Sequence, residues 1–167
     1  GSIFCTFATR DLCTFMLQDS AYIQEREIEY INEKLHRKGQ KDNLETIYTL
    51  EDATRALLQF QSVNYNREFH VTDGVKAIFQ DAGHILGSAN VTLNIHDKRE
   101  GKHIILAFTG DLGRKDLPIL RDPEQIERAD FLISECTYGD REHEKVKNVE
   151  KLVADIVNRT ANRGGKI

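Results

Sequence analysis

This sequence of 167 residues has few cysteines, no long hydrophobic run and only a small net charge. No run of about 18 apolar residues occurs, so we expect no transmembrane helix and no membrane association. The three cysteines, Cys5, Cys13 and Cys136, are odd in number and lack paired spacing. They favour buried or unreactive thiols in a reducing cytoplasm over a disulfide framework. A net charge of −4 gives no general attraction for nucleic acid.

The composition that remains is that of a folded globular domain. Hydrophobic residues make up 40% of the chain and charged residues 30%, which argues against disorder. The chain opens on "GS" and stops at "NRGGKI", where a helix has ended at two glycines and a strand is expected to begin. We therefore expect this chain to be an internal piece of a longer protein.

Helical periodicity dominates the first third of the chain. Two successive helices are predicted over 9–20 and 21–39, the second ending at Gly39. A third helix is predicted over 49–60, with Thr49 and Asp52 forming a capping box. The apolar stripes expected in the core are Leu12, Phe15 and Met16, then Ile28, Ile31 and Leu35, then Ala53, Ala56, Leu57 and Phe60.

From residue 67 the hydrophobic period changes to two, which indicates strands. A hairpin is predicted over 67–83 with its turn at Asp73-Gly74, followed by a strand over 90–96 and a turn over 98–101. The runs 103–110 and 129–135 are continuously apolar, as in strands buried on both faces. The last element is an amphipathic helix over 143–165, with Val146, Val149, Val153 and Ile156 on one face. The fold class is therefore α/β.

Three ionisable residues each follow a predicted strand: His84, Asp111 and Glu135. In sheets covered by helices, functional groups collect where strands run out into loops. Glycines flank His84 and Asp111 and allow tight turns around them. An imidazole and a carboxylate are natural ligands for zinc or manganese. A structural interpretation stays open, in which His84 and Asp111 are turn residues and Glu135 caps the following helix.

Three longer segments carry a family resemblance: "FQDAGHILGSA", "FTGDLGRKDLPILRDP" and "LISECTYGDREH". Together and in this order they resemble the metallo-β-lactamase fold nucleases of the β-CASP group, and most of all their RNA-processing members. The early segment "FATRDLCTFMLQDSAYIQE" is similar to the one that precedes these motifs in that group. The resemblance covers nearly the whole chain.

The resemblance implies a fold, a substrate and a cofactor. It assigns residues 3–143 to part of a metallo-β-lactamase αββα sandwich and residues 144–167 to the start of a β-CASP domain. It implies zinc-dependent hydrolysis of RNA phosphodiester bonds, with two zinc ions per active site. His84 corresponds to a ligand of one zinc, Asp111 to the carboxylate that bridges both, and Glu135 to an acid near the scissile phosphate. His143 falls in the tail of the last motif without a defined role.

The sequence departs from the family in one respect. The cluster His-x-His-x-Asp-His, which supplies most zinc ligands in that family, does not occur in it. The chain alone is therefore expected to be inactive, since two ligands do not hold a zinc as three or four do. The other histidines, His36, His70, His96 and His103, are expected at the surface. Open sheet edges predict association with partner chains, such as a homo-oligomer.

Two alternative functions remain open at this stage. One is a catalytically inactive scaffold homologue that keeps the fold. The other is a hydrolase of the same fold that acts on DNA or on a small molecule, because a fold does not fix a function. The segment "ECTYGDREH" favours the RNA-processing members, because it resembles the start of a domain that the small-molecule enzymes lack.

Overall fold

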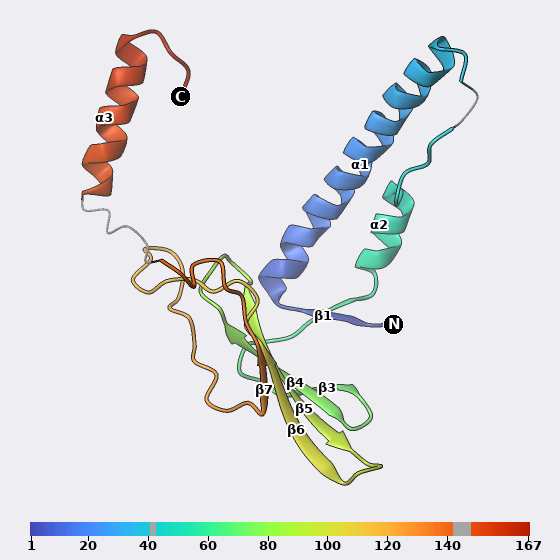
Figure 1. The fold of residues 1–167 in the computed structure, drawn as a ribbon, viewed down its shortest axis with the longest axis vertical. Helices are drawn as coiled ribbons and strands as arrows, with labels where there is room; N and C mark the ends of the chain where they lie inside the picture. The colour runs from blue at the N-terminus through green and yellow to red at the C-terminus, as the bar shows by residue number, and fades with distance from the viewer. Residues whose placement is uncertain (41–42, 142–147) are drawn as a thin grey trace. The chain divides into compact units, whose positions relative to one another are not determined.

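The computed structural model describes residues 1–40, 43–141 and 148–167 and shows an α/β protein (Figure 1), as the sequence predicts. The chain divides into two compact units, Gly1–Glu135 and Cys136–Ile167. The second unit contains one helix, α3 (Val149–Asn162), within its described residues. The assignment of 3–143 and 144–167 to two domains stays a prediction.

The first unit contains two helices and seven strands among its described residues. In chain order they are β1 (Ile3–Cys5), α1 (Phe7–Arg37), α2 (Leu50–Leu57), β2 (Phe60–Ser62), β3 (Phe69–Thr72), β4 (Val75–Asp81), β5 (Ala89–Asp97), β6 (Lys102–Phe108) and β7 (Phe131–Ile133).

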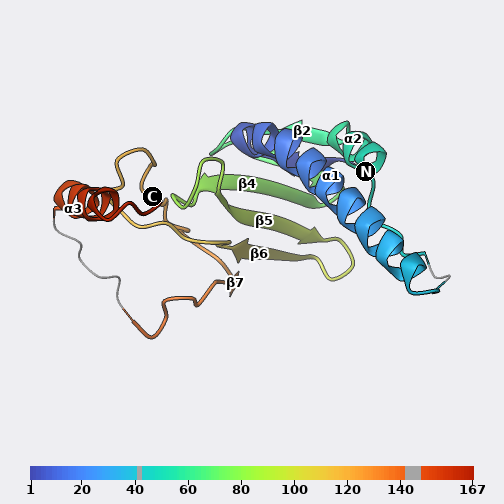
Figure 2. The ribbon, with the colours of Figure 1, turned by 90° about the horizontal axis from the view of Figure 1, so that it is seen from above.

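The main sheet has five strands in the order β3-β4-β5-β6-β7. Figure 2 shows β4, β5 and β6 side by side. The pairs from β3 to β6 are antiparallel, and β6 pairs with β7 in parallel. The predicted hairpin turn at Asp73-Gly74 is confirmed, with Gly74 at a φ of +74°. The second predicted turn, over 98–101, is also confirmed, between β5 and β6. A smaller sheet pairs β1 with β2 in parallel.

The first helical region forms one helix, so the prediction of two helices is wrong. Helix α1 runs unbroken from Phe7 to Arg37 because no glycine or proline interrupts it. It ends where predicted, since Gly39 adopts a φ of +79° just after its last turn. The predicted end of the third helix at Phe60 is also wrong, because α2 stops at Leu57 and Phe60 begins β2. No helix among the described residues is long and apolar enough to span a membrane.

The predicted core of α1 is only partly buried. Helix α1 packs against α2 and β2, and its buried residue is Ala21. Phe15 is 74% exposed and Met16 58% exposed, and Leu12 is exposed as well. The prediction that these three residues lie in the core is therefore wrong. Periodicity identifies the apolar face of a helix, but it does not identify the element that covers that face.

The expectation of strands buried on both faces also fails. Strand β6 is largely half-buried, with Ala107 buried, and all three residues of β7 are exposed. Strand β7 is exposed because it is the outermost strand in the order of the sheet. On α3, Val149, Val153 and Ile156 are exposed, while Val146 lies outside the described residues.

An aromatic cluster joins the two sheets of the first unit. Phe69 of β3 lies between Phe4 of β1 and Phe79 of β4, with ring centroids 5.0 Å and 5.1 Å away. Next to Phe4, the buried Cys5 has a raised pKa because burial penalises its thiolate. The cluster places the smaller sheet and the start of α1 beside β3 and β4.

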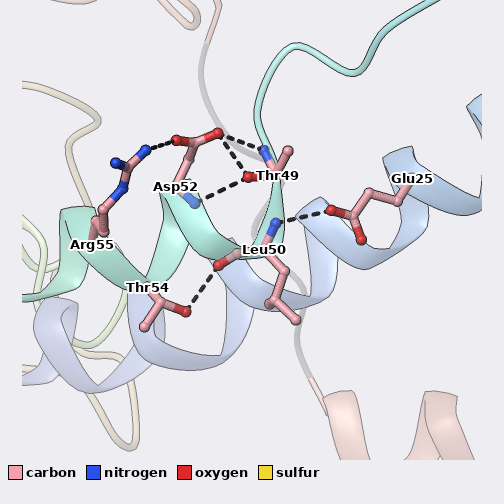
Figure 3. A network of polar contacts seen from close by, with 6 residues as sticks. All are labelled: Glu25, Thr49, Leu50, Asp52, Thr54 and Arg55. Carbon is pink, nitrogen blue, oxygen red and sulfur yellow. Dashed lines mark hydrogen bonds and ion pairs between the residues drawn. The ribbon is translucent and has the colours of Figure 1, made fainter.

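Helix α2 begins with the predicted capping box, which is confirmed (Figure 3). The Thr49 hydroxyl accepts a hydrogen bond from the Asp52 amide at 3.2 Å, and the Asp52 carboxylate accepts one from the Thr49 amide at 3.1 Å. The hydrogen bonds from Thr49, followed by the one from Arg55, lower the pKa of Asp52 to about 2. The Glu25 carboxylate accepts a further bond from the Leu50 amide, which ties α2 to α1.

We predict that Thr49→Ala lowers the free energy of unfolding by about 1 kcal/mol, because it removes the N-cap acceptor. The matched control is Thr54→Ala in the same helix, where the hydroxyl only donates to the Leu50 carbonyl within the helix. Chemical denaturation of both variants measures the difference. Equal losses in the two variants would show that the cap adds nothing specific.

Candidate active site

The structure brings the three predicted site residues close together. His84 lies in the loop between β4 and β5, Asp111 follows β6, and Glu135 follows β7. The His84 Nε2 and Asp111 Oδ2 atoms are 3.6 Å apart. The Glu135 Oε1 atom accepts a hydrogen bond of 2.6 Å from the amide of Leu112, the residue after Asp111. An imidazole and two carboxyl groups thus lie together at the end of the sheet where β4, β6 and β7 finish.

The backbone around His84 is held by polar side chains at both ends of its loop. The buried Asp81 carboxylate accepts a hydrogen bond from the Gly83 amide at 2.9 Å. The Ser88 hydroxyl oxygen accepts bonds from the amides of His84 at 3.1 Å and Ile85 at 3.3 Å. These bonds satisfy the backbone donors of a tight turn and leave the imidazole at the surface.

The loop that carries Asp111 lies directly against the His84 loop, backbone to backbone. The Gly113 amide donates a hydrogen bond of 2.8 Å to the Ala82 carbonyl. A Cβ atom added to Gly113 would lie only 1.7 Å from the Gly83 carbonyl oxygen. Only glycine permits so close an approach, so the residue type at position 113 sets the distance between the two loops.

Gly83 is also close to the backbone of a second part of the β6–β7 connection. A Cβ atom added to Gly83 would lie 2.7 Å from both the Arg121 carbonyl oxygen and the Pro123 nitrogen, and the φ of Gly83 is +64°. The Glu124 amide donates to the Asp81 carbonyl at 2.8 Å. The long connection from β6 to β7 therefore contacts the His84 loop at two places, through Gly113 and through residues 121–124.

The start of α1 supports the far end of the same loop. The hydroxyls of Thr6, the N-cap of α1, and Thr9 donate to the Gly87 carbonyl at 2.9 Å and 3.0 Å. The Tyr65 hydroxyl donates to the Ser88 carbonyl at 2.9 Å. Burial, followed by the nearby Asp81 carboxylate, raises the pKa of Tyr65, so the phenol stays a neutral donor.

The side chains of His84 and Asp111 are both open to solvent, at 43% and 72% exposure. Their 3.6 Å separation is compatible with two ligands of one tetrahedral zinc, which lie about 3.3 Å apart for metal–ligand distances of about 2.0–2.1 Å. In the part of the chain that the structure describes, no group of three or more His, Cys, Asp and Glu side chains could hold a metal ion. His84 and Asp111 therefore fit a metal ion only as part of its ligand set.

The prediction from the sequence missed several residues that support the site. Asp81 and Ser88 flank the His84 loop, and their only sequence signal was their position beside "AGHILG". Glu135 was predicted as an acid at the site, and its contact with the Leu112 amide was not foreseen. His143 lies outside the described residues. In the second unit, the Arg141 guanidinium lies 5.2 Å from the centre of the Tyr138 ring.

Known proteins similar to this chain include ribonucleases and the transcription termination factor FttA of Methanocaldococcus jannaschii, which is 29% identical over 100% of this chain. The chain is 31% identical to an RNase J-like protein of Methanocaldococcus jannaschii over 171 residues, which is 99% of this chain. It is 27% identical to ribonuclease TTHA0252 of Thermus thermophilus and 28% identical to the endoribonuclease ysh1 of Schizosaccharomyces pombe, both over 100% of this chain. No protein-family model matches the chain.

The chain is similar over its whole length to RNA-processing nucleases of the β-CASP group. The predicted resemblance is thereby confirmed. The chain spans about a third or less of these relatives, namely 34%, 33% and 19% of the lengths of the three ribonucleases. The segment carries His84, Asp111 and Glu135 in the arrangement described above.

We predict that Gly113→Ala separates the two loops, because the added methyl group would overlap the Gly83 carbonyl. Overpacking of this kind costs about 1–3 kcal/mol of unfolding free energy. Nuclear magnetic resonance should show shifted His84 and Asp111 signals.

The control is Gly101→Ala, where the φ of +63° strains the backbone but nothing lies within 4 Å of the new methyl group. It should leave the His84 and Asp111 signals in place. Unchanged signals in Gly113→Ala would contradict the role given to the close contact.

Proposed function

We propose that the intact protein is a zinc-dependent ribonuclease that hydrolyses RNA phosphodiester bonds in RNA processing or turnover. Two observations support the proposal: similarity to ribonucleases over the whole chain, and the 3.6 Å approach of His84 to Asp111. The second is the observation that carries it, because it brings a metal-ligating pair together from segments 27 residues apart. The chain alone would be inactive, since this pair is only part of a zinc ligand set.

The proposal includes the remaining features that the resemblance implies. The five-stranded sheet and the smaller sheet would form part of an αββα sandwich, and residues 144–167 would begin the β-CASP domain. Three free cysteines support a cytoplasmic location. A homo-oligomer would cover the open edge of β7, whose three residues are exposed.

The roles of the residues are those that the resemblance implies, and the exposure of His84 and Asp111 is compatible with them. The exposed Asp111 carboxylate would hold both zinc ions, and the exposed His84 imidazole would hold one of them. When bound, two zinc ions polarise a phosphoryl oxygen and lower the pKa of a water molecule. The Asp111 carboxylate also stays accessible to a phosphodiester, because it lies on an exposed loop.

Glu135 would orient Asp111 as well as act as an acid near the scissile phosphate. Its Oε1 atom receives the Leu112 amide at 2.6 Å, so it fixes the backbone one residue beyond Asp111. Its own amide donates to the buried Thr109 hydroxyl at 3.3 Å. These two contacts link the end of β7 to the loop that carries the metal-binding carboxylate.

We predict that Asp111→Asn in the intact protein lowers the rate of cleavage of end-labelled single-stranded RNA by more than about 100-fold. The reason is that even groups that only support a metal ligand are worth about 10–100-fold. His84→Gln should lower the rate less, because His84 would hold one ion whereas Asp111 would hold both.

The matched control is Asp116→Asn, the same substitution in the same connection. Asp116 has a φ of +63°, which asparagine adopts readily, so its activity should stay unchanged. A DNA strand of the same sequence serves as the substrate control. Equal losses for Asp111→Asn and His84→Gln would contradict the assigned roles, and a folded, zinc-loaded intact protein that cleaves no RNA would contradict the function.

A further inference from the structure

Besides His84, the described part of the chain contains four histidines, and three of them lie on one face of the main sheet. His96 on β5 is directly opposite His103 on β6. His70 on β3 is opposite Lys76 on β4, which is opposite Asn94, two residues before His96. Directly opposed residues and residues two apart on a strand share a face. All three histidines are exposed, as the sequence predicts.

These histidines line a hollow of about 330 Å³, together with Glu68 and Gly74. Gly74 has no side chain to fill the hollow, and its carbonyl accepts the His96 amide at 2.7 Å. An added Cβ atom at Gly74 would lie 2.9 Å from the His96 carbonyl oxygen, so a larger residue does not fit there. The hollow is thus a product of the backbone geometry at this turn.

The two opposed imidazole rings are close neighbours. The ring centroids of His96 and His103 are 4.7 Å apart, and the ring planes are tilted by 37°. Two imidazoles at this separation offer one nitrogen ligand each to a single ion. The carboxylate of Glu68, in the same hollow, is paired with the Lys76 ammonium.

The chemistry of the pair selects a class of ion. Imidazole suits zinc, copper and nickel, whereas magnesium and calcium prefer oxygen ligands. Because the described residues contain no group of three suitable ligands, water would complete the coordination. A site of this kind exchanges its ion more readily than a structural zinc site with four protein ligands.

We propose that His96 and His103 form a two-histidine binding site for a late first-row divalent ion such as Zn²⁺. The site is separate from the candidate active site. His84 precedes the first residue of β5, Ala89, while His96 lies near the other end of that strand. The seven residue-to-residue steps from Ala89 to His96 span roughly 24 Å of strand. The site therefore stands independently of the proposed ribonuclease activity.

The test is residue-resolved modification of histidine in the intact protein. Diethyl pyrocarbonate reacts with free imidazole nitrogen, and mass spectrometry of peptides reports the rate at each histidine separately, so an ion bound at His84 does not confuse the result. Zn²⁺ should slow the reaction of His96 and His103 by at least about fivefold, because coordination removes the reactive lone pair. Mg²⁺ should slow neither.

Two variants and one internal control sharpen the test. In His103→Gln, Zn²⁺ should no longer protect His96, and in His96→Gln it should no longer protect His103. His36, whose ring is hydrogen-bonded to Asn43 at 2.9 Å near the end of α1, should react at the same rate with and without Zn²⁺. Unchanged rates at His96 and His103 with saturating Zn²⁺ would overturn the proposal, as would protection of one histidine that survives loss of the other.

Discussion

The contact between Gly113 and Gly83 is the constraint on which the rest of the site depends. Two loops from different strand ends touch through backbone atoms, and a single methyl group at Gly113 would lie 1.7 Å from a carbonyl oxygen. The contact is not a strong interaction, since it adds one hydrogen bond between the Gly113 amide and the Ala82 carbonyl. Its effect is geometric: it fixes how far Asp111 lies from His84. A carboxylate and an imidazole held in this way lose little conformational freedom when they bind a common ion.

Hydrogen bonds with the sheet hold the long β6–β7 connection, which contains Gly113, in place. The Asn90 side-chain amide of β5 donates to the Glu124 carbonyl at 3.0 Å. The Gln80 side-chain amide of β4 donates to the Gln125 carbonyl at 3.2 Å. At the end of the connection, the Asp130 carboxylate accepts the Ile105 amide at 2.8 Å. A connection without a helix or strand of its own is thus held against the sheet by side-chain to backbone bonds. This explains how it presents Asp111 at a defined place although it is long and mostly exposed.

Much of the local structure follows from the sequence, because it depends on neighbouring residues. The capping box at Thr49 and Asp52 and the turn at Asp73-Gly74 are set by short-range hydrogen bonds and by backbone conformation. The order of strands around His84, Asp111 and Glu135 also correctly brought these residues to one edge. Burial did not follow, since Phe15 and the residues of β7 are exposed. Whether an apolar residue is buried depends on which elements cover it, and these lie far away in the sequence. The Gly83–Gly113 contact likewise joins residues that are distant in the sequence.

Anomalous X-ray scattering from crystals of the intact protein grown with zinc tests the central claim most directly. The claim is that the contact of the two loops makes His84 and Asp111 ligands of one ion. The account predicts a zinc signal between the His84 imidazole and the Asp111 carboxylate, and loss of that signal in Gly113→Ala. Zinc bound elsewhere in the protein, with His84 and Asp111 both without metal, would contradict it.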